Sequence, residues 1–393
     1  MRRPVLSVFL TCAIGCALVS GLGYAGDMAP YKIGICVSLT GPAASIGEPE
    51  RNGALVRIND INAAGGINGR KLEAVVDDEQ GAPDKAVIGT KRLIDVEKVV
   101  ALAGYEYSGA AMAAIVPAEA GSTPMVVGCV TEKTWMPTKK WTFSVVPRQK
   151  DAYNIILDSF LQQGAKKIAC IYVDAAMGQM AREALSYVAD QRGIKLAVEE
   201  KYSLGTSDIS PQITHIKSAG ADAIFIGGYV PDAAMVVKTA RALGFTGIIG
   251  GDQAVLGPEF IKLVGKDGEG FITTTPKALV AGELDESDPQ KKVATDLYEK
   301  YTKEHGVFAL GGVHGWDTVN LISEALKKTD PKLDPAKPED VEKIRVQVRD
   351  NLENLGSVIG QNGIFNITPD NHNGLGQKSH VALVLKDGSW KKY

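Results

Sequence analysis

The strongest constraint on the fold of this chain is an alternation of short apolar runs with amphipathic segments, which occurs in two consecutive regions of the sequence. Short uninterrupted apolar runs are typical of strands buried on both faces of a parallel sheet, and apolar residues three or four apart are typical of covering helices. The first region predicts strands at 32–37, 72–76, 99–103 and 124–128, with helices at 48–64, 83–95 and 108–120. The second predicts strands at 167–173, 196–202, 223–227, 247–251 and 270–274, with helices at 178–192, 209–219 and 232–243. The repeated strand–helix–strand order predicts an α/β protein with two doubly wound parallel-sheet lobes.

The length of the chain supports two lobes rather than one. It has 393 residues, which suits two units of about 150 residues each. After the second region come two predicted helices at 288–303 and 311–327, a Pro/Lys/Asp linker at 330–338, a helix at 339–351 and a last strand at 380–385. The formal net charge of -3 gives no basic excess, so nucleic acid is not an expected partner.

The first 25 residues have the pattern of a secretory signal peptide. Arg2 and Arg3 precede an uncharged apolar run at 5–22, and Gly23-Tyr24-Ala25 is a small-x-small cleavage site. A retained membrane anchor and a lipoprotein modified at Cys16 are the alternatives. No later run reaches about 18 uncharged apolar residues, so we expect a soluble protein exported to the periplasm.

The sequence offers no motif for catalysis, metal binding or a cofactor. It contains no G-x-S-x-G, H-E-x-x-H or P-loop pattern and no CxxC or Cys/His cluster, so we expect neither an enzyme nor a metal site. Beyond the signal peptide the cysteines are Cys36, Cys129 and Cys170. Each lies in or at the end of an apolar run, which predicts buried thiols.

One segment carries a specific resemblance: Asn59-Asp60-Ile61-Asn62-Ala63-Ala64-Gly65-Gly66-Ile67-Asn68-Gly69-Arg70-Lys71-Leu72. Shorter segments at 38–42, 107–109, 227–229 and 365–370 agree with it. The chain resembles, over residues 30–393, the leucine/isoleucine/valine-binding family of periplasmic binding proteins, the capture subunits of ABC importers. The resemblance implies a type I periplasmic fold whose two lobes are joined by a three-strand hinge. Lobe 1 would comprise 30–147 and 277–357, and lobe 2 would comprise 148–276 and 358–393, with the third crossing at 358–361.

Two such lobes place the carboxyl ends of their sheets opposite each other, so the cleft between them is the expected ligand site. Ser108 begins a helix, where it can act as N-cap, and free N–H groups there attract a carboxylate. The resemblance places a carboxylate-binding serine at this position. Val130 and Thr131 follow the next strand and can complete the cradle. A plain cap and an ordinary loop remain the alternatives for Ser108 and Thr131.

Four further residues are candidates for the site. Asp252 ends a strand of lobe 2, where an acid suits a ligand ammonium group, although the family usually has Glu there and a helix cap is the alternative. Tyr229 and Met177 are expected to line the cleft. Glu106 departs from the apolar residue of many relatives, and it either contacts a ligand amide or ammonium group or faces solvent.

The sequence therefore predicts a periplasmic solute-binding protein without cofactors, a monomer that delivers its ligand to an ABC permease. The first choice of ligand is an amino acid, aliphatic, branched-chain or otherwise hydrophobic, bound by hinge closure. The alternative is an aromatic or other small carboxylate that lacks an amine. Asp252 distinguishes the two, because an amine-free carboxylate would meet it as a like charge.

Overall fold

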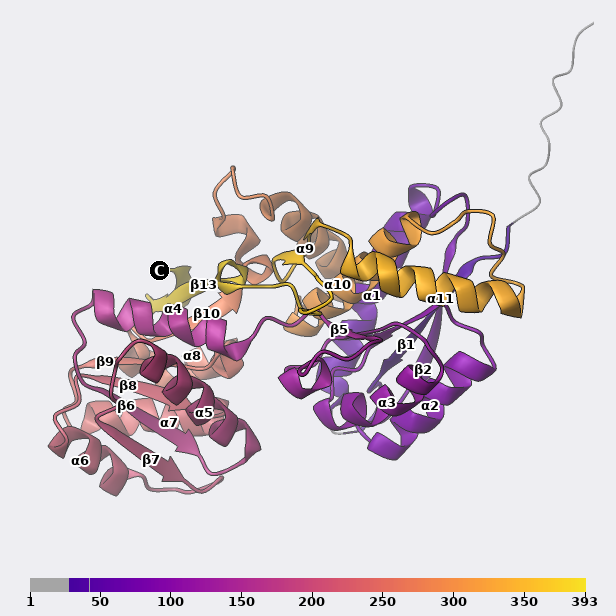
Figure 1. The fold of residues 1–393 in the computed structure, drawn as a ribbon. Helices are drawn as coiled ribbons and strands as arrows, with labels where there is room; N and C mark the ends of the chain where they lie inside the picture. Colours follow the sequence, from indigo (N-terminus) through magenta and orange to yellow (C-terminus); the bar gives the residue numbers. More distant parts are fainter. Residues whose placement is uncertain (1–27, 42) are drawn as a thin grey trace, which may run out of the picture.

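The computed structural model describes residues 28–41 and 43–393, so the predicted signal peptide at 1–25 lies outside the described residues. Within them the chain forms two α/β lobes side by side, and the chain passes between the lobes in the middle of the molecule (Figure 1). None of the helices described has the length and apolar character needed to cross a membrane.

Lobe 1 is built on a five-stranded sheet in the order β2-β1-β3-β4-β5, with all neighbours parallel. The strands are β1 (Tyr31–Val37), β2 (Leu72–Asp78), β3 (Ala101–Gly104), β4 (Met125–Val127) and β5 (Thr142–Ser144), and the helices between them are α1 (Ala44–Ala63), α2 (Pro83–Asp95) and α3 (Ser108–Ala120). The strand order reverses between β1 and β3, so the carboxyl ends of these two strands open a crevice at the edge of the sheet.

Lobe 2 is built on a seven-stranded sheet in the order β14-β13-β10-β9-β8-β6-β7. Its strands are β6 (Ile168–Val173), β7 (Val198–Tyr202), β8 (Ala223–Gly227), β9 (Ile248–Gly251), β10 (Ile272–Pro276), β13 (His380–Lys386) and β14 (Ser389–Lys392), and its helices are α4 (Gln149–Gln162), α5 (Ala176–Gln191), α6 (Ser210–Ser218), α7 (Val230–Ala242) and α8 (Pro258–Val264). The predicted α/β lobes are confirmed, but this sheet is not wholly parallel. Its last two strands are antiparallel to their neighbours, because the chain returns to the sheet from the hinge.

A second set of elements returns to lobe 1. These are α9 (Lys291–His305), α10 (Leu310–Lys327), α11 (Pro338–Glu353) and the hairpin of β11 (Ser357–Ile359) and β12 (Ile364–Asn366). Short 3-10 segments are η1 (Glu132–Thr134), η2 (Gln253–Val255), η3 (Gly265–Gly268), η4 (Lys277–Glu283) and η5 (Gln377–Ser379). In Figure 1 α11 lies along lobe 1, whereas β13 lies in lobe 2 beside β10.

The third crossing between the lobes lies later than 358–361, the position expected from the sequence. Phe365, Ile367 and Leu375 are buried in the same core as the strands of lobe 1, so the chain stays with lobe 1 through Leu375. It enters the lobe 2 sheet only at His380. The hairpin and the turn that follow α11 thus belong to lobe 1, because their apolar side chains complete its core.

The three cysteines of the described chain are free and buried, as predicted. Burial raises the pKa of the Cys129 thiol to about 12, and the pKa of Cys36 and of Cys170 is also raised by burial. They therefore act as small apolar core residues rather than as reactive thiols.

Candidate ligand-binding site

A pocket of about 370 Å³ is lined by residues of both lobes. Lobe 1 contributes the loop after β4, with Val130 and Thr131 and the two residues that follow them. Lobe 2 contributes α4 and α5. The lining residues are Val130, Thr131, Glu132, Lys133, Gln149, Lys150, Met180, Glu183, Ala184 and Tyr187. Two of the predicted site residues thus lie in an interlobe pocket, whereas Ser108, Glu106, Met177, Tyr229 and Asp252 are not among its lining residues.

Ser108 is the first residue of α3, and Tyr107 occupies the N-cap position without a capping side chain. The predicted N-cap role of Ser108 is therefore wrong. The helix begins one residue earlier than a Ser108 cap requires, and the hydroxyl has no hydrogen-bond partner among residues 28–41 and 43–393. The side chain is half-buried, and the first N–H groups of the helix are left without intrahelical acceptors. Both features suit an anionic partner at this end of α3.

Thr131 and Val130 lie on the loop that leads from β4 into η1. Thr131 occupies the N-cap position of η1, and its carbonyl accepts hydrogen bonds from the Thr134 N–H at 3.2 Å and the Thr134 hydroxyl at 2.8 Å. These bonds fix the loop through the Thr131 main chain and leave the Thr131 hydroxyl available. Val130 is 44% exposed, which is high for an apolar residue at the end of a buried strand.

Asp252 is buried, and its own lobe engages both of its oxygens. The Tyr153 hydroxyl donates to Oδ2 at 2.5 Å, and the Ala254 N–H donates to Oδ1 at 2.8 Å. Asp252 therefore caps η2, whereas Gly257 occupies the cap position of α8. Burial raises the pKa of Asp252, and the hydrogen bonds from Tyr153 and Ala254 act in the opposite direction. In this conformation the carboxylate serves as a cap, and its contact with a ligand stays a prediction.

Tyr229 and Met177 stand at the starts of lobe 2 helices. Tyr229 takes the N-cap position of α7, two residues after the end of β8, and its side chain is 43% exposed. Met177 lies in the first turn of α5 and is half-buried. Both side chains retain apolar surface that a ligand or a closing lobe can cover.

Glu106 is buried, so the interpretation that it faces solvent is wrong. Its Oε1 accepts a hydrogen bond from the Ser38 N–H at 3.0 Å, and the Ser38 hydroxyl donates to Oε1 of Glu79 at 2.5 Å. Glu50 of α1 is fully buried nearby, with no hydrogen-bond partner for either oxygen among the described residues. Burial and, to a smaller extent, neighbouring carboxyls raise the pKa of all three carboxyls, and the pKa of Glu79 reaches about 7.

Sequence reasoning missed Glu50 and Glu79 because both lie in polar segments of the sequence, Glu50 in the first half of α1 and Glu79 directly after β2, where an acid is expected to face solvent. The structure brings Ser38, Glu79 and Glu106 together at the carboxyl ends of β1, β2 and β3. Among the described residues there is no group of acids, histidines and cysteines arranged to hold a metal ion. The cluster is thus a set of protonatable groups behind the crevice of lobe 1.

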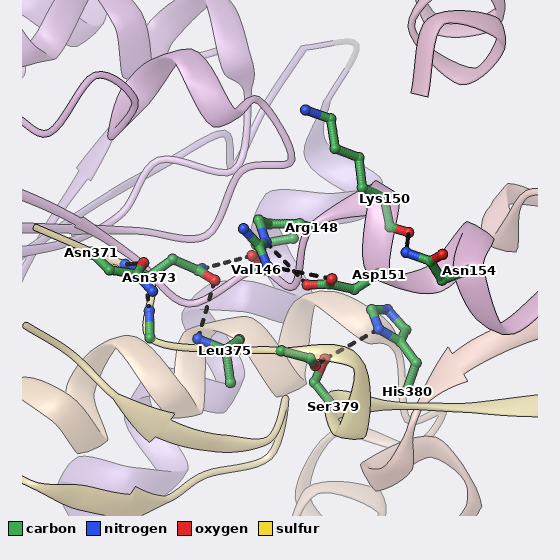
Figure 2. Close-up of polar contacts among 12 residues, drawn as sticks. Val146, Arg148, Lys150, Asp151, Asn154, Asn371, Asn373, Leu375, Ser379 and His380 are labelled. Atoms are coloured by element: carbon green, nitrogen blue, oxygen red, sulfur yellow. Dashed lines mark hydrogen bonds and ion pairs between the residues drawn. The ribbon is translucent and has the colours of Figure 1, made fainter. Parts of the chain in front are cut away.

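Asn373 joins two segments of lobe 1 just before each of them crosses to lobe 2 (Figure 2). Its side-chain amide donates to the Val146 carbonyl at 2.9 Å and to the Ser144 carbonyl at 3.2 Å, so it ties the end of the first lobe 1 segment to the turn that precedes the third crossing. Arg148, at the start of lobe 2, pairs with Asp151 in the first turn of α4 at 3.0 Å.

Comparison with known proteins gives a match over nearly the whole described chain. A family model described as "Periplasmic binding protein" matches residues 30–388. The leucine-, isoleucine-, valine-, threonine- and alanine-binding protein of Pseudomonas aeruginosa is 26% identical over 312 residues, which cover 78% of this chain and 80% of that protein.

Solved structures agree on the fold. An extracellular ligand-binding receptor from Rhodopseudomonas palustris HaA2 has a TM-score of 0.75 and 29% identity, covering 93% of this chain and 99% of that one. A branched-chain amino acid transporter substrate-binding protein from Streptococcus pneumoniae, solved with isoleucine, has a TM-score of 0.69 and 21% identity, covering 92% of this chain and 98% of that one.

Proposed function

This chain belongs to the periplasmic binding protein family, and on that premise we propose that it captures an amino acid in its interlobe cleft for an ABC importer. The family consists of substrate-binding proteins rather than enzymes. The observation that carries the proposal is the pocket lined by the loop after β4 and by α4 and α5, because a ligand there touches both lobes at once. The names of relatives that bind leucine, isoleucine and valine support an aliphatic or otherwise hydrophobic amino acid.

The proposed binding mode starts at lobe 1. The ligand carboxylate meets the loop of Val130 and Thr131, which lines the pocket, and the N-terminus of α3 at Ser108. Ser108, Tyr229 and Met177 lie outside the pocket in this arrangement, and we propose that closure brings Tyr229 and Met177 over the ligand side chain from lobe 2. The ammonium group needs an acid, and Asp252 and Glu106 are the two candidates. Contacts to both lobes favour the closed arrangement by the difference in affinity between the open and closed states.

A second candidate is a small carboxylate without an amine. One specific observation favours it: Asp252 is buried and each of its oxygens accepts a hydrogen bond within lobe 2, from Tyr153 and Ala254, so in this conformation little of the carboxyl is exposed to an ammonium group. An aromatic or aliphatic acid would need only the carboxylate cradle of lobe 1.

The remaining parts of the proposal follow from the family. We propose that the chain is exported to the periplasm after removal of residues 1–25, acts as a monomer and docks on an ABC permease. Intact-mass analysis of protein exported by a Gram-negative host tests the first point, because cleavage before Gly26 gives a defined mass. A retained Met1 or a lipid on Cys16 would contradict it.

A thermal-shift screen against the amino acids and a set of small organic acids tests the ligand class, since a ligand that binds only the folded state raises the melting temperature. L-leucine and 4-methylpentanoate are the informative pair, because they differ in the amine. Stabilisation by L-leucine alone supports the first proposal. Stabilisation by 4-methylpentanoate or an aromatic acid, with no amino acid active, supports the second.

A further inference from the structure

The interlobe pocket carries charges on both of its walls. On the lobe 1 wall Glu132 and Lys133 are consecutive residues of η1. On the lobe 2 wall Lys150 belongs to α4 and Glu183 to α5. Each wall thus presents one acid and one base to the same pocket.

None of these four side chains forms an ion pair within the part of the chain that the structure describes. Charged residues beside them do: Arg148, the N-cap residue of α4, pairs with Asp151, and Arg182 of α5 pairs with Glu199 of β7, each at 3.0 Å. The Lys150 ammonium lies 4.3 Å from the centre of the Tyr187 ring, which keeps it on the pocket wall. Figure 2 shows this side chain extended away from the hinge contacts, with no dashed line at its nitrogen.

We propose that these four residues form an interlobe latch, in which Glu132 pairs with Lys150 and Lys133 pairs with Glu183 when the lobes close on a ligand. This inference rests on the proposed function, since it assigns residues that position the lobes during capture. The pairing is the one that satisfies all four charges across the pocket. The alternative arrangement would place Glu132 against Glu183 and Lys133 against Lys150.

The latch favours the closed state because its charges gain partners only there. In the open pocket they are hydrated, and half-buried or exposed. Closure brings opposite charges together while it removes water from around them, which strengthens their attraction. The four charges thereby raise the affinity for the ligand even apart from any contact with it, because they bias the same open–closed equilibrium that the ligand biases.

A charge-swap experiment tests the latch. Lys133→Glu places three acids and one base around the pocket, and we expect it to weaken L-leucine binding roughly 5- to 10-fold by calorimetry, since it replaces an attraction by a repulsion. Lys133→Glu combined with Glu183→Lys restores the opposite signs, and we expect an affinity within about twofold of the wild type. The matched control is Lys91→Glu, the same charge change on an exposed position of α2 outside the pocket.

The latch would be overturned if the double variant lost as much L-leucine affinity as the two single changes together, or if Lys91→Glu lost as much affinity as Lys133→Glu. The difference between Lys133→Glu and the wild type should also shrink at about 1 M salt, where the screening length falls to about 3 Å. A difference that persists at that salt concentration would likewise count against it.

A second readout separates the latch from the ligand assignment. Spin labels on cysteines introduced at Asp84 of α2 and Lys238 of α7, both exposed, report the interlobe distance, and the native thiols are buried. If no amino acid binds the wild type, the proposed function fails, and the ligand-free distance still tests the latch. Lys133→Glu should lower the fraction of short, closed-state distances in the ligand-free distribution, and the swap should restore that fraction. A closed fraction that is equal in the wild type and in Lys133→Glu would reject the latch.

Discussion

Asn373 donates a hydrogen bond from its side-chain amide to the main-chain carbonyl of Val146, 227 residues earlier, at 2.9 Å (Figure 2). The same nitrogen donates to the Ser144 carbonyl, and the Asn373 Oδ1 accepts from the Leu375 N–H at 3.3 Å. Asn373 is fully buried. One amide thus joins the two lobe 1 segments that lead into the first and third crossings, so the lobe 1 ends of these crossings are held together when the lobes rotate about the hinge.

Asn373→Asp should destabilise the protein markedly. An aspartate at this position cannot donate, so two buried carbonyls lose their donor next to a new buried charge. We expect the free energy of unfolding to fall by about 3 kcal/mol or more, measured by urea denaturation. Asn354→Asp is the matched control, because Asn354 is exposed and donates only to the Asp350 carbonyl. A loss of similar size in both variants would show that the hinge contact is not the cause.

Gly315→Ala should also destabilise the protein, through helix packing. A Cβ added to Gly315 of α10 would lie 1.8 Å from the Glu50 carbonyl oxygen and 3.0 Å from the Ala54 nitrogen, both on the backbone of α1. The two helices would have to separate, at a cost of about 3 kcal/mol in thermal or urea unfolding. Gly282→Ala is the control, since a Cβ added to this exposed residue would meet no atom within 4 Å. Equal melting temperatures for Gly315→Ala and the wild type would contradict this packing.

The two-lobed architecture could be predicted because each strand and helix has a local sequence pattern. The uninterrupted apolar runs around Ile35 and Phe225 are typical of buried strands, and Gly65-Gly66 ends α1 where left-handed backbone is needed. The position of the third crossing could not be predicted in the same way. The apolar pattern of Phe365 and Leu375 shows that these residues are buried, but not in which lobe.

The site was predicted unevenly for a related reason. Val130 and Thr131 could be placed by their position directly after a strand, and that position brought them to the interlobe pocket. The Asp252 carboxyl is held by a hydrogen bond from Tyr153, which lies 99 residues away in the sequence. Glu50 looks like a solvent-facing helix residue, yet the close approach of α1 to α10 and to Gly128 buries it. Such pairings are properties of the packed molecule and leave no local signal.

Ser108→Ala should weaken a carboxylate ligand by about 1–3 kcal/mol and leave the fold unchanged, since the ligand loses one charge-assisted partner. The half-buried Ser108 hydroxyl bonds to none of the described residues, so its removal leaves no internal partner unsatisfied. Calorimetry with the ligand found in the thermal-shift screen measures the affinity, and the ligand-free melting temperature checks the fold. An unchanged affinity would remove Ser108 from the carboxylate cradle.

The last prediction concerns pH and two buried groups with opposite behaviour. Burial, with a smaller effect of His314, lowers the pKa of His380 to about 4, so between about pH 4 and 6.5 the unfolded chain binds a proton that the folded protein does not. His380 therefore makes stability fall as the pH drops through this window. Burial raises the pKa of Asp317 to about 7, so between about pH 4 and 7 the folded protein holds a proton that the unfolded chain releases, and stability falls as the pH rises.

His380→Gln should flatten the acid side of the stability curve, with a change of up to about 3 kcal/mol relative to the wild type between pH 6.5 and pH 4. Asp317→Asn should act in the opposite direction, because it removes the decrease in stability that Asp317 causes between pH 4 and pH 7. The Gln361 and Asn362 N–H groups donate hydrogen bonds to Asp317, so this variant also changes the absolute stability, but the prediction concerns only the slope against pH. Urea unfolding at half-unit pH steps gives both slopes. Because the two variants must change the slope with opposite signs, parallel curves for either variant and the wild type would show that the group titrates alike in the folded and unfolded states.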